Sequence, residues 1–147
     1  MEADDLYLGY DLHLIQDLVF RKYIYGELHW DPTIPGNIER LYNDYKLLNR
    51  LVIDRYPLSD AIVLPKNFDD EPIQQMFHFD PAQLLQDYRS DFIPAGTGEY
   101  FFFTPSRAET YLDMATAACH HEIEALRNRA PLLDELAYAY RAGSLQA

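Results

Sequence analysis

Residues 106–128, SRAETYLDMATAACHHEIEALRN, hold the strongest local signal in this chain of 147 residues. Ser106 and Glu109 have the spacing of a capping box, in which each side chain accepts a hydrogen bond from the other residue's backbone N–H. Apolar and small residues then recur at helical spacing, so the stretch predicts a helix over 106–128. The predicted buried stripe of this helix consists of Ala108, Leu112, Ala115, Cys119, Ile123 and Leu126.

Two further helices are predicted in the first 56 residues. Asn37 is a suitable N-cap for a helix over 38–56, which Pro57 ends. Residues 5–26 show the same period of about 100° per residue, and Gly26 can end this helix. One side of the first helix consists of Leu8, Leu12, Ile15, Val19 and Tyr23.

The middle of the chain, residues 57–104, is less regular because prolines interrupt it at short intervals. Asp80 followed by Pro81 has the pattern of an N-cap and a first helical residue, which predicts a helix to about Phe92. Residues 61–64 and 99–104 have the composition of strands. These two segments either pair as a small ribbon or lie as extended segments against helices.

The expected fold is therefore mainly α, with residues 1–147 forming a single helical domain. It is a compact bundle of four to six helices, with one short two-stranded β element or extended segments in the middle. A last helix is expected over 132–141, after the break at Pro131. No linker is long enough to separate two domains, and the length fits one domain.

Charge and composition exclude several classes of function. The net charge of −12 comes from 24 acidic and 12 basic residues, and it argues against binding to nucleic acids or anionic membranes. No apolar run is long enough to span a bilayer. Cys119 is the single cysteine, and the N-terminus is acidic where a signal peptide would be basic. A cytoplasmic location is therefore expected.

Acidic and aromatic residues alternate in the middle of the chain. Residues 61–104 carry seven acids and two bases. Carboxylates beside aromatic rings capture Lys and Arg side chains by ion pairing and cation–π contact. The predicted partner-binding surface consists of Phe68, Asp69, Asp70, Glu71, Phe77, Phe79, Asp80, Asp87 and Asp91.

The leading hypothesis is a small acidic binding protein, without catalysis or cofactor, that engages and inhibits or neutralises a basic protein partner. Inhibitors, immunity proteins and antitoxins share this size and charge, and the analogy goes no further than size and charge. The sequence contains no nucleophile elbow and no Gly-rich phosphate loop. Cys119 falls in a predicted buried stripe, where it is expected to be a packing residue.

An alternative hypothesis is a helical metal-binding protein or a hydrolase-like enzyme. His13 and Asp17 are four residues apart in the first helix, and Glu124 follows His120 and His121 at helical spacing. Histidine and carboxylate side chains on neighbouring turns can share a divalent metal. This site requires the helices over 5–26 and 106–128 to face each other with these side chains between them.

A second alternative is a structural homodimer. The small residues Ala115, Ala118 and Ala125 would allow two copies of the helix over 106–128 to pack closely.

Two polar residues fall inside apolar helical arcs. Asp11 lies on the apolar side of the first helix, where a carboxylate must be paired, hydrogen-bonded or neutral. Asn49 lies on the apolar side of the second helix, and a hydrogen bond to a neighbouring tyrosine is expected.

Overall fold

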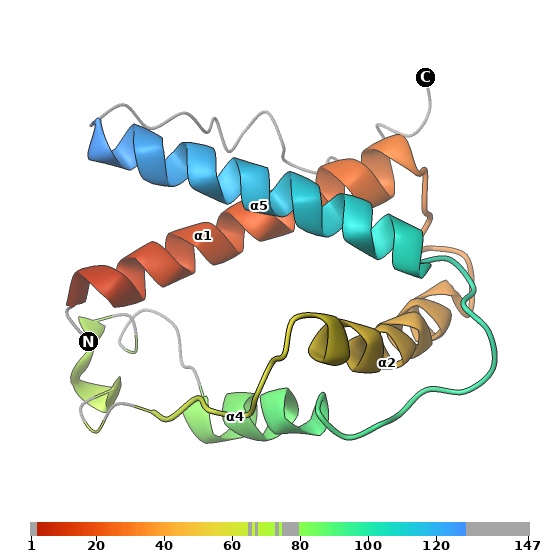
Figure 1. The fold of residues 1–147 in the computed structure, drawn as a ribbon, viewed down its shortest axis with the longest axis horizontal. Coiled ribbons are helices and arrows are strands. Elements are labelled where there is room, and N and C mark those ends of the chain that lie inside the picture. The colour runs from red at the N-terminus through yellow and green to blue at the C-terminus, as the bar shows by residue number, and fades with distance from the viewer. Residues whose placement is uncertain (1–2, 65, 67, 73, 75–79, 129–147) are drawn as a thin grey trace. The chain divides into compact units, whose positions relative to one another are not determined.

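A computed structural model describes residues 3–64, 66, 68–72, 74 and 80–128 and confirms that the chain is mainly helical (Figure 1). None of the described helices is both long enough and apolar enough to cross a bilayer. The helix predicted over 132–141 lies outside the described residues. The described helical elements are α1 (Ala3–Arg21), the π-helix η1 (Lys22–Glu27), α2 (Asn37–Arg55), the 3₁₀-helix η2 (Phe68–Asp70), α4 (Pro81–Ser90) and α5 (Pro105–Arg127).

The bounds predicted for the four long helical segments agree with the structure to within two residues. Asp80 caps α4 as expected, because its carboxylate accepts hydrogen bonds from the N–H groups of Ala82 and Gln83 at 3.1 and 3.0 Å. Helix α5 begins one residue before the predicted capping box. Pro105 takes the first helical position, where its missing N–H leaves no helical hydrogen bond unmade.

The chain groups into two compact units. The first, here called the N–C unit, joins the segment Met1–Ile38 to the segment that begins at Ser106. The second, here called the middle unit, is Glu39–Pro105.

Helices α1 and α5 form the core of the N–C unit by packing against each other (Figure 1). Ile15 and Val19 of α1 are buried against Ala115 of α5. The rings of Phe20 and Tyr111 meet edge to face, with their centroids 5.4 Å apart. Alanine at the contact lets the two backbones approach closely, and the larger apolar side chains fill the flanks.

The buried stripe of α5 differs from the prediction near its C-terminal end. Leu126 was expected inside but is exposed, whereas Ala125 and Glu122 are buried. Glu122 lies seven residues after Ala115, so both residues fall on the same side of the helix.

The first helical segment ends in a wider, π-helical turn and not at a capping residue. Gly26 was expected to end the helix, but η1 passes through it to Glu27. The N–H of Leu28 donates to the carbonyl of Tyr23 at 2.9 Å, which is the i to i−5 bond of a π-helix. The N–H of Trp30 then donates to the carbonyl of Ile24 at 3.0 Å.

The loop after η1 is tied to the start of α2. Asp31 accepts hydrogen bonds from the side chain and the N–H of Thr33 at 2.7 and 2.8 Å, and these bonds lower the pKa of Asp31 below its usual value. Asn37, predicted as the N-cap, is the first residue of α2. Its buried side-chain amide donates to the carbonyl of Asp31 at 2.8 Å, so it holds the loop.

A buried carboxylate organises the middle unit. Asp44 of α2 is 0% exposed and accepts hydrogen bonds from three successive backbone N–H groups. Its oxygens lie 2.8 Å from the nitrogen of Phe101 and 2.7 Å from those of Phe102 and Phe103. Bonds to an ionised acceptor are shorter and stronger than neutral ones, and here they join α2 to a segment almost 60 positions away.

The prediction of a strand over 99–104 is wrong, and Asp44 supplies the reason. Neither this segment nor residues 61–64 forms a strand in the structure. Successive N–H groups of a strand point in opposite directions, toward different neighbours. Here three in a row converge on one carboxylate, so the backbone of 101–103 must curl around Asp44.

Glycine is required where the chain returns to α2. Gly96 has a φ of +88°, and a Cβ built on it would lie 2.9 Å from Cγ and 3.0 Å from the backbone nitrogen of Leu47. Gly98 also has a positive φ, of +78°, but a Cβ there would meet nothing within 4 Å. These angles agree with the turn that Gly96 and Gly98 suggest in the sequence.

Replacement of Asp44 by Asn is expected to lower the free energy of unfolding by about 3 kcal/mol, since a side-chain NH₂ would then face buried N–H groups. Asp54→Asn is the matched control on the same helix. It removes an exposed pair with Arg50 at 2.8 Å and should cost about 0.5 kcal/mol or less. Urea unfolding followed by circular dichroism measures both, and equal losses would contradict the role given to Asp44.

Gly96→Ala should destabilise the protein by about 2–4 kcal/mol, because it combines backbone strain with overpacking against Leu47. Gly98→Ala carries the strain alone and should cost about 1–2 kcal/mol. Thermal unfolding of the two variants separates these effects. If Gly98→Ala destabilises the protein as much as Gly96→Ala does, the close approach of Gly96 to Leu47 does not add to the loss of stability.

Candidate functional site

The predicted acidic surface lies in the middle unit, and most of its carboxylates face solvent. Asp69 and Asp70 of η2 are exposed, and Phe68 and Glu71 are half-buried. Asp80, Asp87 and Asp91, at α4 and its ends, are exposed as well. The two other predicted rings, Phe77 and Phe79, lie outside the described residues. We call the six described acids the acidic set: Asp69, Asp70, Glu71, Asp80, Asp87 and Asp91.

Three members of the acidic set accept hydrogen bonds from neutral groups. Asp80 caps α4 as described above. Asp87 accepts a bond from Nε2 of Gln83, one turn earlier, at 2.8 Å. Asp91 accepts a bond from Nδ2 of Asn49 at 2.8 Å, which links the end of α4 to α2. The sequence correctly indicated that Asn49 needs a partner, but the partner is a carboxylate and not a tyrosine.

No member of the acidic set forms an ion pair with any residue that the structure describes. Two neighbouring acids outside the set do have cationic partners. Asp60 lies 3.3 Å from Arg89, and Asp54 lies 2.8 Å from Arg50. Arg50 and Arg89 of the middle unit therefore pair with other acids, and no cation in the described part of the chain lies within ion-pair distance of the acidic set.

A groove of about 360 Å³ lies beside this surface, between α2, α4 and the chain after α2. Its polar lining residues are Asn49, Ser59 and Asp91, together with the hydroxyl-bearing Tyr88. The hydroxyl of Tyr88 donates to the carbonyl of Ser59 at 3.0 Å and closes one side. We call this the α2–α4 groove; its apolar lining comes from Val52, Ile53, Leu58, Tyr88 and Phe92.

Two half-buried rings of the groove support each other. Tyr88 and Phe92 are one helical turn apart and meet nearly edge to face, with centroids 5.1 Å apart. Leu58 is 49% exposed, and beyond it Ile62 and Val63 reach 51% and 82%. The middle unit therefore combines uncovered apolar side chains with exposed carboxylates.

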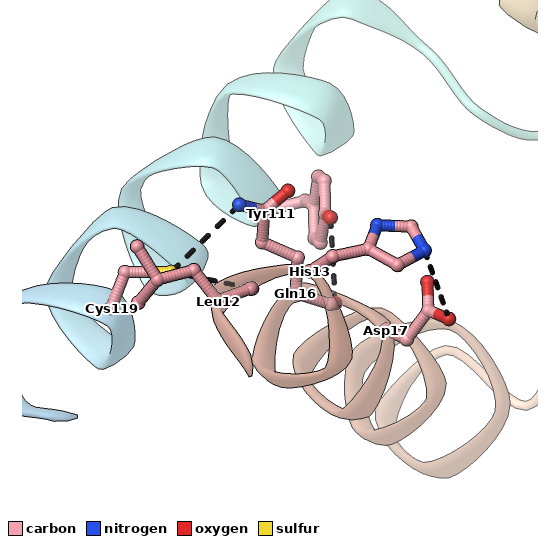
Figure 2. A network of polar contacts seen from close by, with 6 residues as sticks. All are labelled: Leu12, His13, Gln16, Asp17, Tyr111 and Cys119. Atoms are coloured by element: carbon pink, nitrogen blue, oxygen red, sulfur yellow. Dashed lines mark hydrogen bonds and ion pairs between the residues drawn. The ribbon is translucent and has the colours of Figure 1, made fainter. Parts of the chain in front are cut away.

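The residues proposed for a metal site do not form one in the described part of the chain. His13 and Asp17 are exposed neighbours on α1, 3.9 Å apart, and Figure 2 shows this pair lying away from Cys119. His120, His121 and Glu124 of α5 are also exposed. Among the described residues, no group of three or more His, Cys, Asp or Glu side chains lies together as metal ligands would.

Cys119 belongs to a contact network between α1 and α5 (Figure 2). Its sulfur lies 3.8 Å from the carbonyl of Leu12 and 3.9 Å from Nε2 of Gln16. The hydroxyl of Tyr111 donates to the carbonyl of Gln16 at 3.4 Å. Burial raises the pKa of Tyr111, and the nearby Asp17 and Cys119 raise it further. The half-buried thiol thus packs between the helices, as its sequence position indicates.

The alanine face proposed for a homodimer is used within the chain. Ala115 is buried against Ile15 and Val19, and Ala118 packs against the same cluster. Ala125 is buried as well. The close helix approach that Ala115 and Ala118 allow takes place between α1 and α5.

Within the part of the chain that the structure describes, two buried carboxylate oxygens have no hydrogen-bond partner. One is Oδ2 of Asp11, which the sequence placed on the apolar side of the first helix. The other is Oε2 of Glu122, which the sequence analysis missed. The position of Glu122, one helical repeat after Ala115, is the signal that would have identified it.

Alkaline pH is expected to destabilise the N–C unit through Tyr111. The pKa of Tyr111 in the folded chain lies above its ordinary value of 10.0, so the unfolded chain loses this proton first. Stability is then unaffected below pH 10 and falls as the pH rises toward the folded pKa.

Tyr111→Phe should therefore show a smaller loss of melting temperature between neutral pH and pH values above 10. Tyr7→Phe, which changes an exposed tyrosine of α1, is the control and should behave like the parent protein. The fluorescence of Trp30, the single tryptophan and a buried residue of this unit, reports the transition. A loss as steep in Tyr111→Phe as in the parent would contradict this role.

Comparisons of the chain with known protein families, with curated proteins and with solved structures gave no match.

Proposed function

We propose that this protein is a small acidic binding protein that engages a basic protein partner through the acidic set and the apolar surface beside it. The observation that carries the proposal is the absence of any ion pair to these six acids from a described residue. Each of the other two acids nearby, Asp54 and Asp60, lies against an arginine. Unmatched carboxylates attract a complementary basic surface and speed its approach.

The surroundings of the acidic set suit a protein partner better than a small cation. Leu58, Ile62, Val63 and Ile93 are all about half exposed or more. Apolar surface that becomes covered on binding supplies affinity, whereas the charges supply orientation and rate. A partner with basic residues around an apolar centre would use both kinds of surface.

Inhibition or neutralisation of the partner belongs to the same proposal. A basic enzyme or toxin that acts on an anionic substrate needs its positive surface free, and an acidic protein seated there would block it. A cytoplasmic location goes with this role and rests on the single cysteine and the charge of the sequence.

The test combines identification of a partner with charge reversal. Protein captured from native lysate and identified by mass is purified, and its affinity is measured by calorimetry at low and at physiological salt. The variant Asp69→Lys, Asp70→Lys, Glu71→Lys should bind at least about tenfold more weakly at low salt. The affinity of the parent should fall as salt rises, because screening shortens the reach of the charges.

The control variant has the same change in net charge but carries it in the N–C unit. Glu27→Lys, Asp113→Lys and Glu124→Lys replace three exposed acids there, and the affinity should change by no more than about twofold. Circular dichroism confirms that both variants are folded. Equal affinity of the 69–71 variant and the parent at low salt would show that the partner does not use these acids.

A further inference from the structure

We propose that the α2–α4 groove receives a single arginine side chain of the basic partner, with its guanidinium on Asp91. This inference rests on the proposed function and specifies which chemical group of the partner the middle unit recognises.

The size and lining of the groove suit one long side chain. At about 360 Å³ it lies near the lower end of the range of ligand pockets, so a larger ligand does not fit inside. Val52, Ile53 and Leu58 offer an apolar wall. Arginine and lysine lay their aliphatic stems along such a wall and keep the charged head at a polar edge.

The polar edge of the groove provides two acceptors. Asp91 uses Oδ1 to accept the bond from Nδ2 of Asn49 at 2.8 Å, and its Oδ2 has no described partner. Because Asn49 uses its side-chain NH₂ in this bond, its side-chain oxygen Oδ1 remains as a second acceptor beside the carboxylate. A guanidinium presents several N–H donors in one plane, so it can reach both oxygens, whereas an ammonium is a point charge.

The aromatic residues favour arginine as well. Tyr88 and Phe92 line the groove and are half-buried, so part of each ring is accessible. A planar guanidinium stacks on such rings and gains cation–π attraction. Arg89, two residues before Asp91 in the chain, is already paired with Asp60 at 3.3 Å, so its charge is balanced locally.

The experiment titrates the full ¹⁵N-labelled chain with N-acetyl-arginine amide and follows its amide spectrum by NMR. Saturable shifts should appear at the side-chain amide of Asn49 and at the backbone amides of Ser59 and Asp91, with a Kd on the order of 1–10 mM. N-acetyl-citrulline amide has the same shape without the charge and should give no saturable shift. N-acetyl-lysine amide should bind several-fold more weakly than the arginine probe.

The variant Asp91→Asn keeps an acceptor for Asn49 but removes the charge, and it should weaken binding of the arginine probe about tenfold. Asp54→Asn, which removes one exposed charge of α2 outside both the groove and the acidic set, is the matched control and should leave the Kd unchanged. The amide spectra without probe show that both variants keep the fold.

The inference is overturned if the arginine probe gives no saturable shift, if its shifts lie outside the groove, or if citrulline amide shifts the same residues equally. It is also overturned if Asp91→Asn binds as the parent does. These outcomes leave the proposed function standing wherever the 69–71 charge reversal still weakens partner binding. Arginine binding in the groove together with a partner insensitive to that reversal would refute the use of residues 69–71 and retain the groove.

Discussion

The middle unit depends on a carboxylate with no exposure to solvent. Asp44 accepts hydrogen bonds from three successive backbone N–H groups of residues 101–103, so these N–H groups are not available to a neighbouring strand. Asn43, the residue before it, exchanges two further bonds with the backbone of Thr97, at 2.9 and 3.0 Å. The side chains of α2 thus supply hydrogen bonds to the backbone of residues 97 and 101–103, as a neighbouring strand would in a sheet. A buried carboxylate is tolerated where both of its oxygens accept hydrogen bonds, as they do here.

The helices could be predicted from the sequence because their signals are local. Periodicity and caps lie within a few residues, and they placed the helix ends to within two positions. The segment 99–104 was not predictable in this way, because Tyr and Phe favour strands on composition alone. A sign of the true arrangement was present in α2, where Asp44 stands between Leu41 and Leu48 on the buried side. The division into two units has no linker to mark it and emerges from contacts between distant segments.

The candidate site was predictable in part. Charge density indicated the acidic middle, and most of its carboxylates are exposed and form no ion pair with a described residue. The groove beside them was not predictable, since it forms only when Asn49 meets Asp91, 42 positions later. Asn49 was recognised as a polar residue in an apolar arc, but spacing along one helix cannot reveal a partner on another. The metal ligands considered for α1 and α5 failed for the same reason, because matching spacing on two helices does not bring their side chains together.

The π-helix η1 shows how a helix can end without a capping side chain. After α1 the hydrogen bonds span more residues. The N–H of Leu28 donates to the carbonyl of Tyr23, five residues earlier, and the N–H of Trp30 donates to the carbonyl of Ile24, six residues earlier. Each bond gives a terminal carbonyl a donor from the chain itself, so the carbonyls at this end are satisfied as the coil opens. The side chains of residues 27–30 are therefore not needed as caps and are available for packing. Trp30 is buried, so its backbone helps to end the helix while its side chain packs inside.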